Sequence, residues 1–461
     1  MSNNLKKIYD LTVSYRITRR YVNFALRNFY SNFVVLGKEN IPKKGPVIFS
    51  PNHQNALLDA LLILKSTPHK LSSVFIARGD IFKKGFVSNA LRFFKILPAF
   101  RIRDGYENLG KNDATFDESR EVLEAQNALC IFPEGNQSDK RRLQPLVKGI
   151  FRIAFATQEQ IGDKEDLKII PVGIDYSRRE RFGENVIINY GAPVSVAEYL
   201  PLYKENPAIA INRFREKLSE KMRAQIIDFA TEKYYDCFET AAEVASSQVS
   251  NQLFGKNDVA SRFQAQQKIA ENLIKIESEN SEKVEKLDKI CTEYRKLKSE
   301  TKLTTATLEK PFSFCTFLFQ SLLLLITFPV FAIGFALNII PFLLPGIIRK
   351  KMGVKYDGFF GSIDFVLGAI IIFPIFYLIN TVLFAIFAPF AWWTIPIFAV
   401  SQFVLGKLAF CWIKSAKKYA NKIRYALLKI SKGSTIENMQ EIREKIISIA
   451  AEPVIKYRAK K

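Results

Sequence analysis

The chain has 461 residues and carries 67 Lys and Arg against 45 Asp and Glu, which gives a formal net charge of +22. Hydrophobic residues make up 48% of it, a content that excludes a wholly disordered chain, and the length predicts several structural units. Charges recur up to Lys310, but residues 311–348 and 365–406 contain none. Apolar runs of this length are typical of membrane-spanning helices and exclude a soluble globular protein.

Residues 1–33 are predicted to form a basic amphipathic N-terminal helix. Apolar residues recur at helical spacing from Ile8 to Phe33, with lysines and arginines among them. Such a helix can lie in the lipid headgroup layer or pack on the domain that follows. The sequence leaves both alternatives open.

Residues 34–205 are predicted to form an α/β domain with a largely parallel sheet flanked by helices. Short apolar runs bordered by turns are expected to be strands, and helical segments fill the gaps between them. The expected strands are Val47–Ser50, Val74–Ala77, Ala128–Phe132, Ile169–Ile174 and Val186–Asn189.

Residues 206–310 are predicted to form a charged helical region. Apolar residues from Leu273 to Leu297 follow a heptad pattern that is interrupted at Asn280, which favours a helical hairpin over a long coiled coil. At the other end of the chain, residues 414–461 are predicted to form a basic helical tail.

Residues 311–413 are predicted to form two transmembrane hairpins. The second apolar block fits spans at about 363–387 and 394–413. The first fits a tighter hairpin or a re-entrant pair that is broken near Pro329 or Pro341. Basic residues flank both blocks, and basic flanks favour the cytoplasmic side. We therefore expect an integral membrane protein whose catalytic domain and tail lie on the cytoplasmic face.

Cysteine and histidine usage narrows the possible site chemistry. The five cysteines are scattered without CxxC spacing, and the two histidines are His53 and His69. This pattern predicts neither a disulfide framework nor a metal site, and we expect no resident cofactor.

His53 and Asp59 are the candidate catalytic pair. They follow the expected strand Val47–Ser50, and ligands of open α/β sheets bind at the carboxyl ends of strands. An imidazole beside a carboxylate can act as a general base. On an ideal helix their six-residue separation would point the two side chains about 120° apart. Contact therefore requires a bulge, or a histidine that precedes the helix. No GxSxG elbow accompanies the pair, which favours direct transfer to a hydroxyl acceptor.

Three further motifs follow in order: Phe100-Arg101-Ile102-Arg103-Asp104, Phe132-Pro133-Glu134-Gly135-Asn136-Gln137-Ser138 and Ile170-Pro171-Val172-Gly173. Together with the His53 block, this set resembles the glycerolipid O-acyltransferase family, which acylates glycerol 3-phosphate or 1-acylglycerol 3-phosphate. That family commonly has four residues between its histidine and aspartate, whereas this chain has five. The longer spacing and the later apolar blocks are similar to the glycerol-3-phosphate and dihydroxyacetone-phosphate acyltransferase branch.

The resemblance implies roles for individual residues. His53 would be the base and Asp59 its orienting partner. The residues expected to bind the glycerol phosphate are Arg103, Glu134 and Gly135, with Arg101 as a further phosphate candidate. Glu134 is not expected to hold the phosphate itself, but to accept from a glycerol hydroxyl or to position an arginine. Pro171 lies in a block usually linked to the acyl donor, although a buried strand explains this block equally well. Gln137 stands where the family commonly has arginine, and the charge could come from Lys140, Arg141, Arg142 or Lys148.

The implied function is a membrane-bound O-acyltransferase. It would move a fatty acyl group from an acyl-CoA or acyl carrier protein thioester to glycerol 3-phosphate, with lysophosphatidic acid as the alternative acceptor. A less favoured alternative is a non-enzymatic, membrane-tethered anion-binding protein. Basic residues are spread along the chain, and we expect them to contact an anionic lipid bilayer rather than nucleic acid.

Overall fold

The computed structural model describes most of the chain and divides it into two compact units. The described residues are 7–82, 85–100, 110–309, 313–388 and 391–459. One unit, called here the α/β unit, comprises Met1–Asp228 and Tyr356–Ser362. The other, called the helical unit, comprises Phe229–Lys355 and Ile363–Lys461.

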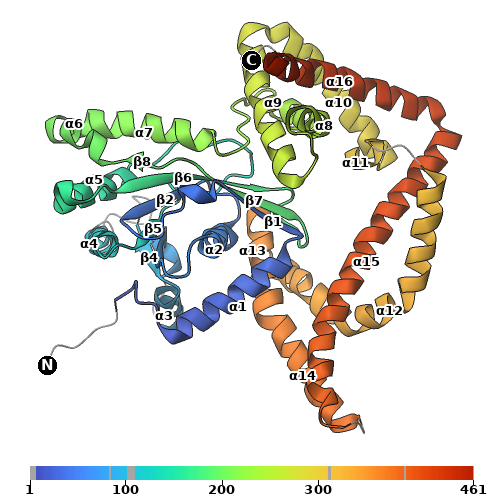
Figure 1. The fold of residues 1–461 in the computed structure, drawn as a ribbon, viewed down its shortest axis with the longest axis horizontal. Coiled ribbons are helices and arrows are strands. Elements are labelled where there is room, and N and C mark those ends of the chain that lie inside the picture. Colours follow the sequence, from blue (N-terminus) through green and yellow to red (C-terminus); the bar gives the residue numbers. More distant parts are fainter. Residues whose placement is uncertain (1–6, 83–84, 101–109, 310–312, 389–390, 460–461) are drawn as a thin grey trace. The chain divides into compact units, whose positions relative to one another are not determined.

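The α/β unit is built on one eight-stranded sheet in the order β1-β7-β6-β2-β5-β3-β4, with β8 paired to β6 (Figure 1). All neighbouring strands in the sheet are parallel except that β6 runs antiparallel to β7 and β8. The strands are β1 Asn32–Leu36, β2 Val47–Pro51, β3 Ser73–Arg78, β4 Ile96–Ala99, β5 Ala128–Cys130, β6 Lys168–Tyr176, β7 Asn185–Tyr190 and β8 Val194–Ser195. The predicted α/β domain with a largely parallel sheet is therefore confirmed.

All five expected strands are present as β2, β3, β5, β6 and β7. The sequence did not signal β1 and β4, which are the two edge strands of the sheet. Edge strands keep part of their surface exposed, so their apolar pattern is weak, and β4 also contains Pro98. β6 continues two residues beyond the predicted strand and ends at Tyr176.

Helices pack on this sheet to form the core of the α/β unit. They are α1 Val13–Phe29, α2 Ala56–Ser66, α3 Phe86–Phe93, α4 Lys111–Glu124, α5 Gly149–Ile161, α6 Leu200–Glu205 and α7 Pro207–Arg223. The helix α7 follows the boundary predicted at residue 206, and in the structure it belongs to this unit. Its Phe214 and Leu218 are fully buried in one cluster with Phe151 and Phe155 of α5.

The helix α1 packs on α2 through one face. Its buried Arg19 donates to the carbonyl oxygens of Leu64, at 2.7 Å, and Thr67, at 3.0 Å, near the C-terminal end of α2. The opposite face keeps Val13 and Ile17 more than half exposed. The packing alternative is thus observed, and the exposed apolar face keeps lipid contact as a prediction for this helix.

The helical unit begins with a cluster of α8, α9 and α10, against which α16 packs (Figure 1). Its helices are α8 Tyr235–Phe254, α9 Val259–Glu279, α10 Ser281–Thr301, α11 Thr305–Leu308, α12 Phe314–Lys351, α14 Phe373–Phe387, α15 Thr394–Ser431 and α16 Gly433–Ala459. Between α9 and α10, the Asn280 side chain accepts from the Lys283 N–H at 3.0 Å and caps α10. The predicted break at Asn280 is confirmed.

Three helices are long and apolar enough to cross a membrane among the residues that the structure describes: Phe314–Lys351, Asp357–Phe387 and Thr394–Ser431. They identify the chain as a membrane protein. A break was expected in the first apolar block near Pro329 or Pro341, but α12 is one continuous helix of 38 residues that contains Pro329, Pro341 and Pro345. Apolar helices tolerate such prolines because neighbouring groups and local adjustments satisfy the freed carbonyl groups.

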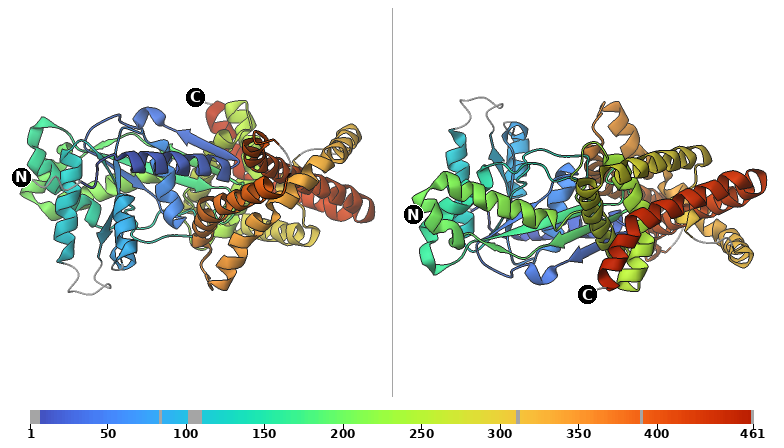
Figure 2. Two further views of the ribbon diagram at one scale, coloured as in Figure 1. Left: turned by 90° about the horizontal axis from the view of Figure 1, so that it is seen from below. Right: turned by 90° about the horizontal axis from the view of Figure 1, so that it is seen from above.

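The helices α12 and α15 pack closely along each other (Figure 2). A Cβ atom added at Gly334 would lie 2.3 Å from the carbonyl oxygen of Leu405, so this crossing requires glycine. Next to it, the Asn338 amide donates to the Gln402 carbonyl at 3.1 Å and accepts from the Tyr377 hydroxyl at 2.6 Å. Small residues and buried amides of this kind hold helices together in lipid.

Candidate active site

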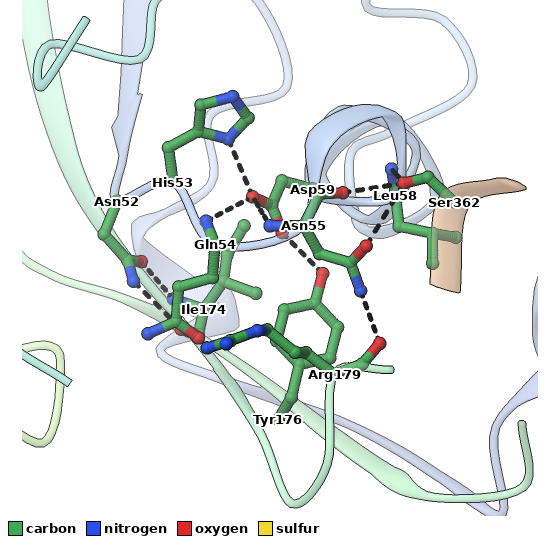
Figure 3. A network of polar contacts seen from close by, with 10 residues as sticks. All are labelled: Asn52, His53, Gln54, Asn55, Leu58, Asp59, Ile174, Tyr176, Arg179 and Ser362. Carbon is green, nitrogen blue, oxygen red and sulfur yellow. Dashed lines mark hydrogen bonds and ion pairs between the residues drawn. The ribbon is translucent and has the colours of Figure 1, made fainter. Parts of the chain in front are cut away.

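His53 and Asp59 are in direct contact at the carboxyl end of β2 (Figure 3). The distance from His53 Nδ1 to Asp59 Oδ2 is 2.8 Å, and the side chains are 17% and 0% exposed, respectively. His53 lies in the turn between β2 and α2, which begins at Ala56. The histidine thus precedes the helix, one of the two arrangements that the six-residue separation allows.

The buried Asp59 carboxylate accepts hydrogen bonds at both oxygens. Oδ2 accepts from the N–H groups of Gln54 and Asn55, each at 2.7 Å, and Oδ1 accepts from the Tyr176 hydroxyl at 2.5 Å. Burial raises the pKa of Tyr176 well above its ordinary value, and the Asp59 charge adds to this effect. The hydroxyl therefore stays protonated and donates a hydrogen bond to the carboxylate. A carboxylate held in this way orients Nδ1–H of His53 and leaves Nε2 to act as a base.

Two further contacts fix the turn that carries His53. Asn52 binds Ile174 of β6 through both amide atoms: Nδ2 donates to the carbonyl at 3.1 Å and Oδ1 accepts from the N–H at 2.7 Å. The N–H of Ser138 donates to the His53 carbonyl at 3.0 Å, and the imidazole lies 4.3 Å from the Phe132 ring, centroid to centroid. The His53 turn and the segment 132–138 therefore lie side by side.

Glu134 is buried in this second segment, with 5% of its surface exposed. Its Oε1 is buried without a hydrogen-bond partner among the described residues. Burial raises the pKa of the Glu134 carboxyl to about 8, although backbone hydrogen bonds at His53 and Gln144 act in the opposite direction. At pH 7 this carboxyl is mostly neutral, so it can donate a hydrogen bond to a phosphate without repelling it.

Gly135 shapes the same turn. Its φ is +67°, and an added Cβ would lie 3.3 Å from Val147 Cγ1. Glycine adopts this backbone conformation without the strain that other residues incur. Its N–H donates to the Phe132 carbonyl at 3.2 Å within the turn. The contact of Gly135 with phosphate stays a prediction.

The structure does not show substrate contacts for the other predicted site residues. Arg101 and Arg103 lie outside the described residues, so their phosphate contacts stay predictions. Pro171 is buried in β6 opposite Ser50 of β2, which agrees with a structural strand, and its link to the acyl donor stays a prediction. In the part of the chain that the structure describes, no group of three or more His, Cys, Asp or Glu side chains is arranged to hold a metal ion.

Arg141, one candidate for the charge lost at Gln137, is paired with Asp175. Its Nε and Nη2 donate to the two carboxylate oxygens at 2.7 and 3.2 Å, and Nη2 also donates to the Tyr176 carbonyl at 2.9 Å. Burial raises the pKa of Asp175, and the Arg141 charge opposes this rise. The guanidinium thus supports the end of β6 beside Tyr176.

Sequence reasoning missed three residues around the pair: Asn52, Tyr176 and Ser362. Asn52 adjoins His53 in the motif, so its place in the site could have been inferred. Tyr176 continues the side-chain alternation of β6 beyond Ile174, and a longer strand would have brought it to the site. Ser362 donates to the Asn55 carbonyl at 2.9 Å from a segment 307 positions away, and no local pattern indicates that contact.

Comparison with known proteins agrees with this geometry. A family model described as Acyltransferase matches residues 32–175, which include His53, Asp59 and Glu134. This part of the chain is therefore similar to acyltransferases. Among curated proteins similar to it, glycerol-3-phosphate O-acyltransferase 2 of Saccharomyces cerevisiae is 25% identical over 114 residues, 24% of this chain and 15% of that protein.

A chloroplastic 1-acyl-sn-glycerol-3-phosphate acyltransferase of Brassica napus is 24% identical to this chain over 210 residues, 45% of this chain and 55% of that protein. The predicted resemblance to the glycerolipid acyltransferases is thereby confirmed. The matched region spans 15% of the yeast relative and about half of the Brassica relative. A solved structure, the 1-acyl-sn-glycerophosphate (LPA) acyltransferase of Thermotoga maritima, aligns with 45% of this chain and 84% of its own at 23% identity and a TM-score of 0.30.

Proposed function

We propose that the protein is a membrane-bound O-acyltransferase that transfers a fatty acyl group from a thioester to the hydroxyl of glycerol 3-phosphate. The observation that carries this proposal is the 2.8 Å contact between His53 Nδ1 and the fully buried Asp59 carboxylate. The acyl donor is a thioester of coenzyme A or acyl carrier protein, and no resident cofactor is needed for the transfer.

The chemistry follows from the orientation of the imidazole. His53 Nε2 takes the proton of the acceptor hydroxyl as its oxygen attacks the thioester carbonyl. When the tetrahedral intermediate collapses, the carbon–sulfur bond breaks, and the leaving thiolate receives that proton from the imidazolium. Asp59 stabilises the imidazolium between the two steps. The neutral carboxyl of Glu134 donates a hydrogen bond to the acceptor phosphate.

The identity of the acceptor substrate is the more specific part of the proposal. Glycerol 3-phosphate is supported by the five-residue spacing between His53 and Asp59 and by the similarity to the yeast glycerol-3-phosphate O-acyltransferase. Lysophosphatidic acid is the second candidate, because the Brassica relative is named for the 1-acylated acceptor. Both acceptors present a free hydroxyl and a phosphate to the same catalytic pair.

A donor-by-acceptor activity matrix on the purified full-length protein tests the function. We expect transfer to glycerol 3-phosphate, and we expect His53→Ala to abolish it. His69→Ala is the matched control, because His69 is the other histidine and is exposed. A His53→Ala protein with unchanged transfer would refute the catalytic assignment. Transfer to lysophosphatidic acid alone would replace the proposed acceptor by the second candidate.

We further propose that the catalytic domain lies on the cytoplasmic face. Residues 356–362 belong to the α/β unit, and no described helix before α12 could cross a membrane by length and composition. Both ends of α12 are then on one side, which a helix bent at its prolines can achieve. The helices α14 and α15 form the remaining hairpin, because α16 packs on α8. Basic residues around Lys351 favour the cytoplasm.

Cysteine labelling tests this topology after Ser replaces the exposed Cys315 and Cys411. With Lys351→Cys we expect reaction with a membrane-impermeant reagent from the cytoplasmic side. With Ala391→Cys, between α14 and α15, we expect reaction from the opposite side. Labelling of both positions from the same side would contradict the α14–α15 hairpin, and labelling of residue 351 from outside would contradict the cytoplasmic assignment.

A further inference from the structure

The segment 356–362 joins the apolar helix α12 to the next apolar helix, yet it belongs to the α/β unit. It approaches the His53 turn through Ser362, whose side chain is buried with 5% of its surface exposed (Figure 3). The Ser362 hydroxyl accepts from the Leu58 N–H at 3.0 Å and donates to the Asn55 carbonyl at 2.9 Å. Both partners lie between His53 and Asp59 in the sequence.

These contacts replace a helix cap that the turn itself does not provide. The residue at the N-cap position of α2 is Asn55, whose side chain makes no capping hydrogen bond. A capping side chain usually accepts from the N–H two or three residues later, and the Leu58 N–H stands at that place. Here Ser362 accepts this bond instead. The Asn55 amide is used elsewhere, because it donates to the Arg179 carbonyl at 2.8 Å.

Further contacts hold the segment where Ser362 can act. Arg179 donates to both carboxylate oxygens of Asp357, at 2.9 and 3.0 Å. Gly361 passes so close that an added Cβ would lie 2.5 Å from the Arg179 carbonyl oxygen and 2.9 Å from Asn55 Nδ2. A residue with a side chain would therefore push the segment away from the turn.

The backbone of the His53 turn needs contacts from other segments to hold its conformation. Ala56, the first residue of α2, has a φ of +36°. Residues other than glycine adopt such a backbone only at a cost, and the conformation persists where surrounding contacts hold it. The N–H groups of Gln54 and Asn55 both donate to Asp59. A change in this backbone would thus move the carboxylate that orients His53.

We propose that Ser362 is a positioning residue for His53 and Asp59, and that acyl transfer therefore depends on the segment between the membrane helices. The inference rests on the proposed function. Ser362 touches neither reacting group. It acts by capping α2 and fixing the Asn55 carbonyl, so that the carboxylate and the imidazole keep their mutual orientation. The segment 356–362 then serves to complete the active site.

Steady-state kinetics of the full-length protein in lipid test the proposal, with glycerol 3-phosphate and acyl-CoA as substrates. We expect Ser362→Ala to lower kcat by about 10-fold, because small displacements of catalytic groups are costly, with KM for both substrates within about twofold. Ser362→Thr keeps the hydroxyl and should restore kcat. Ser313→Ala is the matched control, since Ser313 caps α12 through the Thr316 N–H, far along the chain from this turn.

Several results would overturn the proposal. These are a Ser362→Ala kcat within about twofold of wild type, an equal kcat loss in Ser362→Thr, an equal loss in Ser313→Ala, or a change confined to KM.

If Ser362→Ala does not fold, Asp357→Asn is the deciding variant, because Asp357 is about half exposed and its replacement disturbs the fold little. In Asp357→Asn, a lower kcat at unchanged KM supports the proposal, and an unchanged kcat overturns it. A wild-type protein without transfer activity would overturn both this proposal and the proposed function, whereas an active wild type with an unaffected Ser362→Ala overturns this one alone.

Discussion

Replacing Glu134 by glutamine tests whether this residue works as a neutral acid. Burial raises the pKa of its carboxyl from 4.5 to about 8. At pH 7 most molecules then carry a protonated Glu134. Glutamine has nearly the same shape, cannot ionise and still donates hydrogen bonds. We therefore expect Glu134→Gln to keep most of the acyl transfer activity at pH 7.

The raised pKa also makes folding stability depend on pH. Below pH 4.5 the Glu134 carboxyl is protonated in both the folded and the unfolded chain, so it has no effect. Between pH 4.5 and 8 the folded chain keeps a proton that the unfolded chain releases. Stability then falls by about 1.4 kcal/mol per pH unit as pH rises. The total loss above pH 8 is about 5 kcal/mol. Glu134→Gln removes this slope.

The unfolding of the α/β unit can be followed at Cys130, which is fully buried in β5. The three tryptophans lie at positions 392, 393 and 412, outside this unit, so their fluorescence does not report on it. We propose urea titrations at pH 5.5, 6.5 and 7.5, with thiol labelling of Cys130 read by mass spectrometry. The exposed Glu159, replaced by glutamine, serves as the control. Equal pH slopes for wild type and Glu134→Gln, or an inactive Glu134→Gln at pH 7, would refute the reasoning.

Three further substitutions probe the supports of the site, with the same labelling and kinetics as readout. Tyr176→Phe removes a hydrogen bond to the buried dyad carboxylate, so we expect a loss of about 2 kcal/mol in stability and a lower kcat at unchanged KM. Arg141→Met leaves the buried Asp175 unpaired and should cost about 3–5 kcal/mol, part of which Asp175→Asn should restore. Ala56→Gly should cost nothing, since its φ is positive, whereas Ala114→Gly on the exposed face of α4 should cost about 1 kcal/mol.

The sequence predicted the features that depend on neighbouring residues. Buried central strands such as Ile169–Ile174 appear as continuous apolar runs, because both faces of a parallel strand are covered. The His53 turn could be placed at the carboxyl end of its strand, because it directly follows the apolar run Val47–Ser50. Asn280, which interrupts a heptad pattern, correctly marked the end of one helix and the cap of the next.

The features that local patterns do not encode were missed. Pro329 and Pro341 suggested a break, but an apolar helix can accommodate prolines, so α12 is one continuous helix. The helix α7 looked like part of the charged region because most of its residues are polar. Its few large apolar residues, Phe214 and Leu218, nevertheless fill the core of the α/β unit. Ser362 is a single small polar residue, and nothing in its neighbourhood marks it as a cap for a helix 304 positions earlier.

The unusual spacing of His53 and Asp59 can now be explained by the local backbone. Asp59 lies in the first turn of α2, where side chains lean toward the N-terminus of the helix, so its carboxylate faces the turn that holds His53. A shift of one position along α2 would rotate the carboxylate by about 100°. The fifth intervening residue must therefore be accommodated in the turn before the helix, and it is here that Ala56 takes its left-handed backbone conformation. A longer turn is harder to hold in one conformation, and in this protein the hydroxyl of Ser362 and the amide of Asn52 hold its two ends.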